Sequence, residues 1–407
     1  MSNKPLPQYY RKAYQDFSGG LNDFLSPLTI KQNQFTTLTN ALVNNRNILE
    51  KTNGYSLDGS PFPGTATCFP RTMVNYRRGS AVDKLIVCGL DTGNANETYK
   101  IDTKETDGTG TYSYVCHTTG TAAFTNANTA VVGTSTVWLS HLKAGDKIKS
   151  SAHADSAYGE IATVNSDTSI TLSAVYSGAT VAATTYNARI ILHKDYIPQS
   201  VVFNNNCIIS NGSDKMMTYN NTTLNTITDT DAPRAPFIEP HKSRLFAATS
   251  STLYWSAAND ETTWDAASLE PIFPNDSGSI CAIKSFGDSI LVFKDSGRIY
   301  QVMGSFDQDS IGYVDYIRKL DIPSNIGNIA GFTPVVHDDN KIYFLAQTGL
   351  YSLDQRGTLN KISWDVDNLV SSVAIRPGTT AAKSYPYNSK TQWDAGTHSG
   401  TIARTSG

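Results

Sequence analysis

A β-hairpin pattern recurs five times along this chain of 407 residues, and the repeat limits the possible folds more than any other feature. In each copy a polar turn leads into a run of alternating apolar residues. A Gly, Ser or Asn turn follows, and a second run ends in an aromatic residue. Alternation with a period of two, interrupted by turn residues, is typical of antiparallel hairpins. The copies occupy residues 84–102, 205–220, 243–257, 288–304 and 340–354.

The last four copies are spaced like the blades of a β-propeller. They start 38, 45 and 52 residues apart, in or near the range of about 40 to 50 residues of a four-stranded blade. A single blade exposes two apolar faces, and stacking blades around an axis covers them. Further strand candidates, "CAIKSF" and "IGNIAGFTPVVH", lie between the hairpins. We therefore predict an all-β protein, a β-propeller of about five or six blades, in which the termini could complete the sixth.

A block of different composition lengthens the first interval. Residues 120–186 are rich in Ala, Thr and Ser, and removing these 67 residues reduces the interval from 121 to 54 residues, close to one blade. Inside the block, "AGDKIKS", "GEIATV" and "TSITLSA" read as strands, the last two joined by the turn "NSD". The block predicts a small inserted β-barrel or sandwich.

The repeat and the block divide the chain into four regions. Residues 1–64 form an extended N-terminal arm, residues 65–117 and 188–375 the propeller, residues 118–187 the inserted domain, and residues 376–407 a C-terminal extension or linker. Within the propeller, Ile290, Val292 and Ile299 alternate along one hairpin. We expect these three side chains to lie in the core.

Composition argues against several classes of function. The formal net charge is -3, and 17% of residues are charged. This composition does not predict a general attraction to nucleic acid or to anionic membranes. The adjacent Arg77 and Arg78 fit a solvated loop better than a phosphate site. The five cysteines are widely spaced in strand-like runs, which predicts buried reduced thiols. We expect a soluble protein without a signal peptide or membrane span.

No motif for catalysis, a cofactor or a metal stands out. His337 lies beside two aspartates, but its surroundings fit a hairpin turn. Residues 293–300 faintly resemble the Asp-box turn of sialidases and fit a structural turn. Asp307 and Asp309 alternate as in a calcium loop, but the remaining ligand spacing is missing. We predict a non-enzymatic protein with no catalytic residues, no cofactor and no metal site.

Four aromatic residues offer a sugar-stacking surface as an alternative to core packing. Tyr254 and Trp255 are adjacent on a predicted strand and therefore point to opposite faces. Trp264 and Trp364 are the other two. We expect the series to pack between blades.

The arm and the blades together resemble the tail nozzle, or tail tubular protein B, family of short-tailed bacteriophages and related stopper proteins. The opening "DFSGGLNDFLSPLTIKQNQFTTLTNALVNNRNILEKTNGY" is similar to the start of that family. "LYWSAANDETTWDAA", "ILVFKDSGRIYQVMG" and "KIYFLAQTGLYSLD" resemble its recurring blade segments, in the same order. The inserted block resembles small β domains of phage virion proteins. Nozzle proteins are usually longer, so either a distal part is missing or this is a shorter ring protein of the same kind.

The resemblance implies a virion structural protein of the tail, assembled in the host bacterial cytoplasm. Such a protein forms a closed ring, with six copies in the family, below the portal and adaptor, and contacts other tail proteins or fibres. Viral double-stranded DNA passes through the lumen without sequence-specific binding. Apolar arm residues are the expected contacts with a neighbouring subunit or the adaptor. They are Phe17, Leu21, Phe24, Leu25, Leu28 and Phe35.

Two other functions stay open. The chain could be a receptor- or glycan-binding propeller of the phage tail, which would need converging carboxylates or arginines at one mouth. It could also be a free scaffold that binds a host protein.

Overall fold

The structure of the chain, a computed structural model, describes residues 41–43, 49–51, 68–78, 82–91, 96–102, 113–276, 278–307, 314–320, 335–337, 340–346 and 348–364. These residues are mostly strands, with one short helix, α1 (Trp138–His141), and one 3-10 turn, η1 (Asp155–Ala157). A separate hairpin pairs β1 (Ala41–Val43) with β2 (Leu49–Lys51). Within these ranges no helix is long and apolar enough to cross a membrane.

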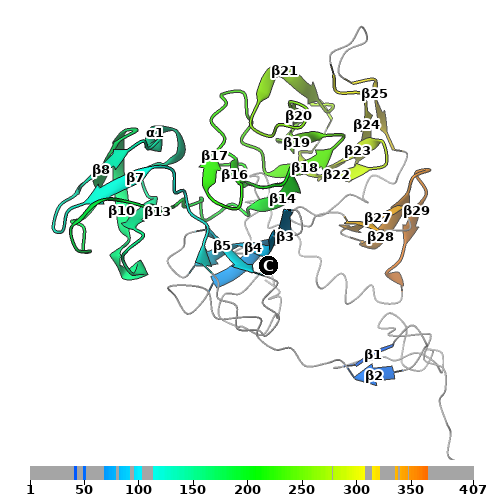
Figure 1. The fold of residues 1–407 in the computed structure, drawn as a ribbon. Helices are drawn as coiled ribbons and strands as arrows, with labels where there is room; N and C mark the ends of the chain where they lie inside the picture. Colours follow the sequence, from blue (N-terminus) through cyan, green and yellow to red (C-terminus); the bar gives the residue numbers. More distant parts are fainter. Residues whose placement is uncertain are drawn as a thin grey trace, which may run out of the picture.

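Five four-stranded antiparallel sheets, blades 1 to 5, are arranged as a fan in the described part of the chain (Figure 1). The strands of each blade follow one another in sequence. Blade 1 contains β3 (Cys68–Arg78), β4 (Val82–Asp91), β5 (Asn96–Asp102) and β6 (Ser113–Tyr114). Blade 2 contains β14 (Gln199–Phe203), β15 (Asn206–Ser210), β16 (Met217–Tyr219) and β17 (Leu224–Thr226). Blade 3 contains β18 (Phe237–His241), β19 (Arg244–Ala248), β20 (Thr252–Ser256) and β21 (Trp264–Pro271).

The last two blades follow the same plan. Blade 4 contains β22 (Ile280–Phe286), β23 (Ser289–Lys294), β24 (Ile299–Met303) and β25 (Tyr316–Lys319). Blade 5 contains β26 (Val335–His337), β27 (Lys341–Ala346), β28 (Gly349–Asp354) and β29 (Leu359–Lys361). The first strands β3, β14, β18 and β22 contact one another in order. The first strand of a blade is therefore the innermost.

Each of the five predicted hairpins is the central strand pair of one blade. The pairs are β4–β5, β15–β16, β19–β20, β23–β24 and β27–β28. The predicted all-β propeller is confirmed. Ile290, Val292 and Ile299 are fully buried, which confirms the prediction from the alternating pattern.

The blades are joined by separate apolar cores. Ile290 and Val292 pack toward blade 3, whereas Leu291 and Phe293 on the same strand pack toward blade 5. One strand thus contributes to two cores through its period of two. Each fully buried aliphatic or aromatic side chain contributes roughly 1.5 to 3 kcal/mol to stability.

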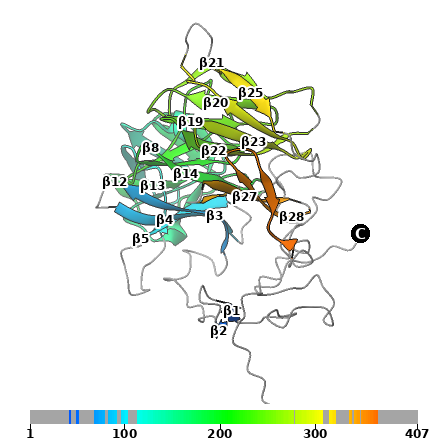
Figure 2. The ribbon, with the colours of Figure 1, turned by 90° about the vertical axis from the view of Figure 1, so that its right-hand side faces the viewer.

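Residues 121–189 form a seven-stranded sheet, the inserted sheet, which curls into a nearly closed barrel beside the blades (Figures 1 and 2). No strand of this sheet pairs with a described strand of a blade. The order of strands is β12-β7-β8-β11-β10-β9-β13. Their bounds are β7 (Thr121–Phe124), β8 (Ala130–Thr134), β9 (Lys147–Ser150), β10 (Gly159–Ser166), β11 (Ser169–Leu172), β12 (Val181–Thr184) and β13 (Tyr186–Arg189). Three of the strands match the three predicted from the sequence.

The inserted sheet has a core centred on Trp138. Its indole N–H donates to the Tyr186 hydroxyl at 2.9 Å, so the buried ring has a partner for its polar atom. Gly133 lies against this ring, and a Cβ there would come within 2.8 Å of Trp138. A side chain at residue 133 would therefore displace the indole. The side chains of Cys88, Cys116, Cys207 and Cys281 are buried, as predicted.

Candidate functional site: the junction of the inserted sheet and blade 2

The chain enters and leaves the inserted sheet through two adjacent segments. His117 and Ala188 form a β-bridge, with N–H···O distances of 2.8 and 3.0 Å. The incoming segment also pairs with blade 2, because the Leu224 N–H donates to the Cys116 carbonyl at 2.9 Å. The base of the inserted sheet is therefore bonded to the outermost strand of blade 2.

Two histidines whose rings are in contact lie at this base. His117 is fully buried, and its Nδ1 lies 3.1 Å from the Leu224 carbonyl and 3.0 Å from Asn225 Oδ1. Both partners are acceptors, so Nδ1 carries the proton. The His117 ring centre lies 4.9 Å from that of His141. Burial and the neighbouring His141 lower the pKa of His117 to about 4, so its ring is neutral at pH 7.

His141, at the end of α1, joins the inserted sheet to β17. The Thr226 N–H donates to His141 Nδ1 at 3.1 Å, and the Thr226 hydroxyl donates to the His141 carbonyl at 3.0 Å. Burial lowers the pKa of His141. The contact between His141 and Thr226 is therefore made by neutral groups.

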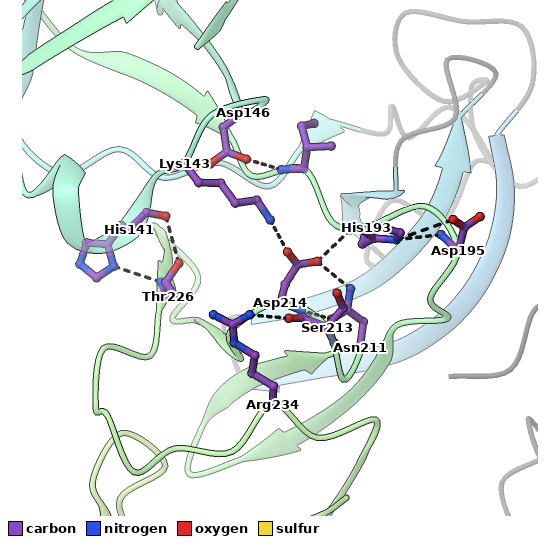
Figure 3. Close-up of polar contacts among 11 residues, drawn as sticks. His141, Lys143, Asp146, His193, Asp195, Asn211, Ser213, Asp214, Thr226 and Arg234 are labelled. Atoms are coloured by element: carbon purple, nitrogen blue, oxygen red, sulfur yellow. Dashed lines mark hydrogen bonds and ion pairs between the residues drawn. The ribbon is translucent and has the colours of Figure 1, made fainter. Parts of the chain in front are cut away.

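Two carboxylates hold the segment that leads out of the inserted sheet (Figure 3). Asp146 is fully buried, and its two oxygens accept from the N–H groups of Ile191 and Lys143, each at 2.8 Å. Burial raises the pKa of Asp146 to about 7, although both hydrogen bonds act in the opposite direction. This carboxyl fixes the loop before β9 against the outgoing segment.

Asp214, in blade 2, also holds the segment that leads out of the inserted sheet. It pairs with Lys143 and accepts from the His193 N–H and the Asn211 side-chain amide, each at 2.8 Å. Burial acts to raise the pKa of Asp214, but Lys143 and the other donors outweigh it and the pKa is lowered. Asp214 thus joins the inserted sheet, the outgoing segment and blade 2 in one network.

The turn that carries Asp214 is itself constrained. Asn211 Oδ1 accepts from the N–H groups of Ser213 and Asp214, at 3.0 and 2.8 Å, and Arg234 donates to the Ser213 carbonyl at 3.1 Å. Gly212 adopts φ +80° against Pro236, a conformation that favours glycine. The local sequence "SNGSD" encodes this turn.

The arrangement is suited to holding two parts of the chain together. Most polar groups of the junction bond one another or the backbone across it, whereas His117 Nε2 is buried without a hydrogen-bond partner among the described residues. The rings of His117 and His141 are neutral. In the described ranges, no group of three or more His, Cys, Asp or Glu side chains could hold a metal ion. The junction therefore joins the inserted sheet to blade 2 through hydrogen bonds and one ion pair.

The structure places some of the residues singled out from the sequence, and others lie outside the described residues. The interface residues Phe17, Leu21, Phe24, Leu25, Leu28 and Phe35 lie outside the described residues, as do the C-terminal extension and most of the arm. His337 ends β26. Asp307 pairs with Arg244, and Asp309 is outside the described residues. The turn within residues 293–300 is confirmed as structural, closing β23 onto β24.

The aromatic series is only partly in the core. Trp255 and Tyr254 pack into different cores on opposite faces of β20, and Trp264 is buried, as predicted. The prediction for Trp364 is wrong, since its side chain is 63% exposed. It lies beyond β29, the outermost strand of blade 5, with Lys361 Nζ 4.5 Å from its ring centre.

Sequence reasoning missed the junction. The partners of each contact are far apart in the chain, as Lys143 and Asp214 are, and no local pattern marks them. The one usable signal was the Asn-Gly-Ser-Asp turn at residues 211–214.

Fold and junction together define a β-propeller with an inserted β domain fixed on its second blade. No protein-family model matches the chain, and no protein of curated function does.

Among solved structures, PorZ, an essential bacterial surface component of the type-IX secretion system of Porphyromonas gingivalis, is 10% identical with a TM-score of 0.31. That match covers 73% of this chain but only 33% of PorZ. AztD of Citrobacter koseri is 12% identical with a TM-score of 0.27, covering 69% of this chain and 81% of AztD. BBS1N, solved in complex with ARL6DN, is 10% identical with a TM-score of 0.32, covering 75% and 86%. Similarities this distant carry no functional inference.

Proposed function

We propose that this chain is a structural protein of a bacteriophage tail, a nozzle or tube ring through whose lumen the genome passes. One support is the ordered sequence resemblance. Its blade segments coincide with β20 and the following loop, with β23–β24 and with β27–β28. A resemblance in order along several blades is stronger than any single motif.

The observation that carries the proposal is the junction. Asp214 and His141 form hydrogen bonds that hold the inserted sheet on blade 2, and Asp146 forms hydrogen bonds that hold the outgoing segment. A ring that conducts DNA under load needs rigid subunits more than reactive groups. The formal net charge of -3 also suits a conduit, because every phosphate neutralised by Lys or Arg would retain the genome.

In this proposal the subunits form a closed ring, and six copies is the number taken from the resemblance. The apolar arm residues 17–35 join neighbouring subunits or the adaptor. The portal, adaptor and other tail proteins are the partners. Heterologous contacts of this kind close into a ring when the rotation between subunits allows it.

Mass measurement and imaging of the full chain test the proposal. We expect light scattering to give about six subunits and negative-stain electron microscopy to give closed rings with a central opening. Removing residues 1–35 should leave a folded monomer, whereas the exposed-surface control Asp231→Ala should keep the ring. A full chain that stays monomeric at every concentration would overturn the proposal.

One observation favours the second candidate, a receptor- or glycan-binding propeller of the tail. The exposed Trp364 ring offers an aromatic face on which a sugar can stack, with the Lys361 ammonium beside it. In that case glycans should quench the tryptophan fluorescence. Trp364→Ala should abolish the effect and Tyr316→Ala, at another exposed aromatic, should not.

A further inference from the structure

The described blades have one core fewer than a closed ring requires. A ring of five blades has five contacts between neighbours. Four cores join blades 1 and 2, 2 and 3, 3 and 4, and 4 and 5. Among the described residues, no apolar core joins blade 5 to blade 1.

The blade 1 face that looks away from blade 2 carries one exposed and one half-buried apolar residue. On β3, Val74 and Tyr76 point toward the core shared with blade 2. Met73, which comes directly before Val74 and points in the opposite direction, is 62% exposed. Its cross-strand partner Val87 is fully buried, and the half-buried Leu85 lies two residues before Val87 on β4.

The opposite end of the fan has a similar face. On blade 5, Tyr351 and Leu353 point toward blade 4. Leu350, which is half-buried, points the other way and pairs with the half-buried Leu345. The Ile362 N–H donates to the Leu350 carbonyl at 2.9 Å, and the Ile362 side chain is 46% exposed. These two faces, the end faces, border the sector between blades 5 and 1.

The hairpin of β1 and β2 pairs with no other strand among the described residues. It forms a two-stranded sheet by itself, paired from Ala41↔Lys51 to Val43↔Leu49. Isolated two-stranded hairpins are marginally stable at best in water. Its sequence, "ALVNNRNILEK", supplies apolar residues to both strands. A stable hairpin here needs a surface on which to pack.

We propose that the hairpin of residues 41–51 packs into the sector between blades 5 and 1 of its own chain, as part of a sixth blade. Residues 52–67 connect it to β3 and can span roughly 50 Å when extended, enough to reach either end face. Blade 2 occupies only residues 199–226, and residues 41–67 before β3 are a stretch of similar length.

The hairpin of the same chain is the favoured occupant because of its tether. A short tether gives an effective concentration in the millimolar range, which a second copy reaches only at high protein concentration. Residues 1–40 remain outside the proposed contact. The inference therefore does not depend on the ring assembly.

Hydrogen exchange on the full chain tests the inference. The amides of residues 41–43 and 49–51 should be protected at low protein concentration. Met73→Asp and Ile362→Asp, one on each end face, should each speed their exchange by about tenfold or more. Val132→Asp, at an equally exposed apolar residue of the inserted sheet, should leave it unchanged.

Three results would overturn the inference. The first is rapid exchange of the hairpin in the unmodified chain. The second is protection that neither end-face variant reduces, provided that near-ultraviolet circular dichroism shows both variants folded. The third is protection that appears only as concentration rises, since that would assign the sector to the hairpin of another copy.

Discussion

Removing the Asp214 carboxylate should loosen the outgoing segment of the inserted sheet. In Asp214→Ala the His193 N–H and the Asn211 amide lose their acceptor, and Lys143 loses its ion pair. A neutral hydrogen bond contributes about 0.5 to 1.5 kcal/mol and one to a charged group about 1.5 to 3. Asp214 is partly exposed, and water replaces some of these contacts. We therefore expect a loss of about 2 to 3 kcal/mol.

The assay is hydrogen exchange at the His193 amide, which reports local opening. A loss of about 2 kcal/mol corresponds to roughly thirtyfold faster exchange, since each 1.4 kcal/mol is tenfold. Asp231→Ala, at an exposed aspartate of the same blade region, should change that rate less than twofold. If His193 exchanges at the same rate in Asp214→Ala and the unmodified chain, the junction does not depend on this carboxylate.

Three further predictions concern the folded state. His117→Asn should make the stability less sensitive to acid. Because the pKa of His117 is lowered to about 4 in the folded chain, the unfolded chain binds more protons between about pH 6.5 and 4. Unfolding measured across that window should show the unmodified chain losing about 3 kcal/mol more stability than the variant. Val292→Asp should prevent folding, because an unpaired carboxylate in a core costs several kcal/mol, and a soluble product with unchanged circular dichroism would show that β23 is misassigned. Replacing residues 118–187 by a short Gly-Ser linker should leave the blades folded, since His117 and Ala188 are hydrogen-bonded neighbours; insolubility of that variant would show that blade 2 requires the inserted sheet.

The fold was predictable because its signals are local. Antiparallel hairpins place their partners within a few residues of a turn, so alternation in residues 288–304 determines both pairing and burial. The change of composition at residues 120–186 likewise lies in one stretch of sequence. Both features are visible without knowledge of the distant contacts.

The junction was not predictable because its signals are distant. Lys143 and Asp214 belong to different sheets, and each alone resembles an ordinary surface charge. Asp146 in "AGDKI" reads as a turn residue, and only the fold shows that its carboxyl is buried. The prediction for Trp364 was wrong because the residue lies just beyond the outermost strand of blade 5 and not on a strand between two blades.

The order of strands within each blade has a consequence for synthesis on the ribosome. Every blade is built from consecutive strands, so each can pair as soon as its own segment has emerged, and the N-terminal parts fold first. Blade 2 differs, because its outermost strand bonds to Cys116 and to α1 of the inserted sheet. The inserted sheet emerges before that strand does. It can therefore serve as a finished template when β17 arrives, and a delay in its folding would leave the edge of blade 2 open to pairing with other nascent chains.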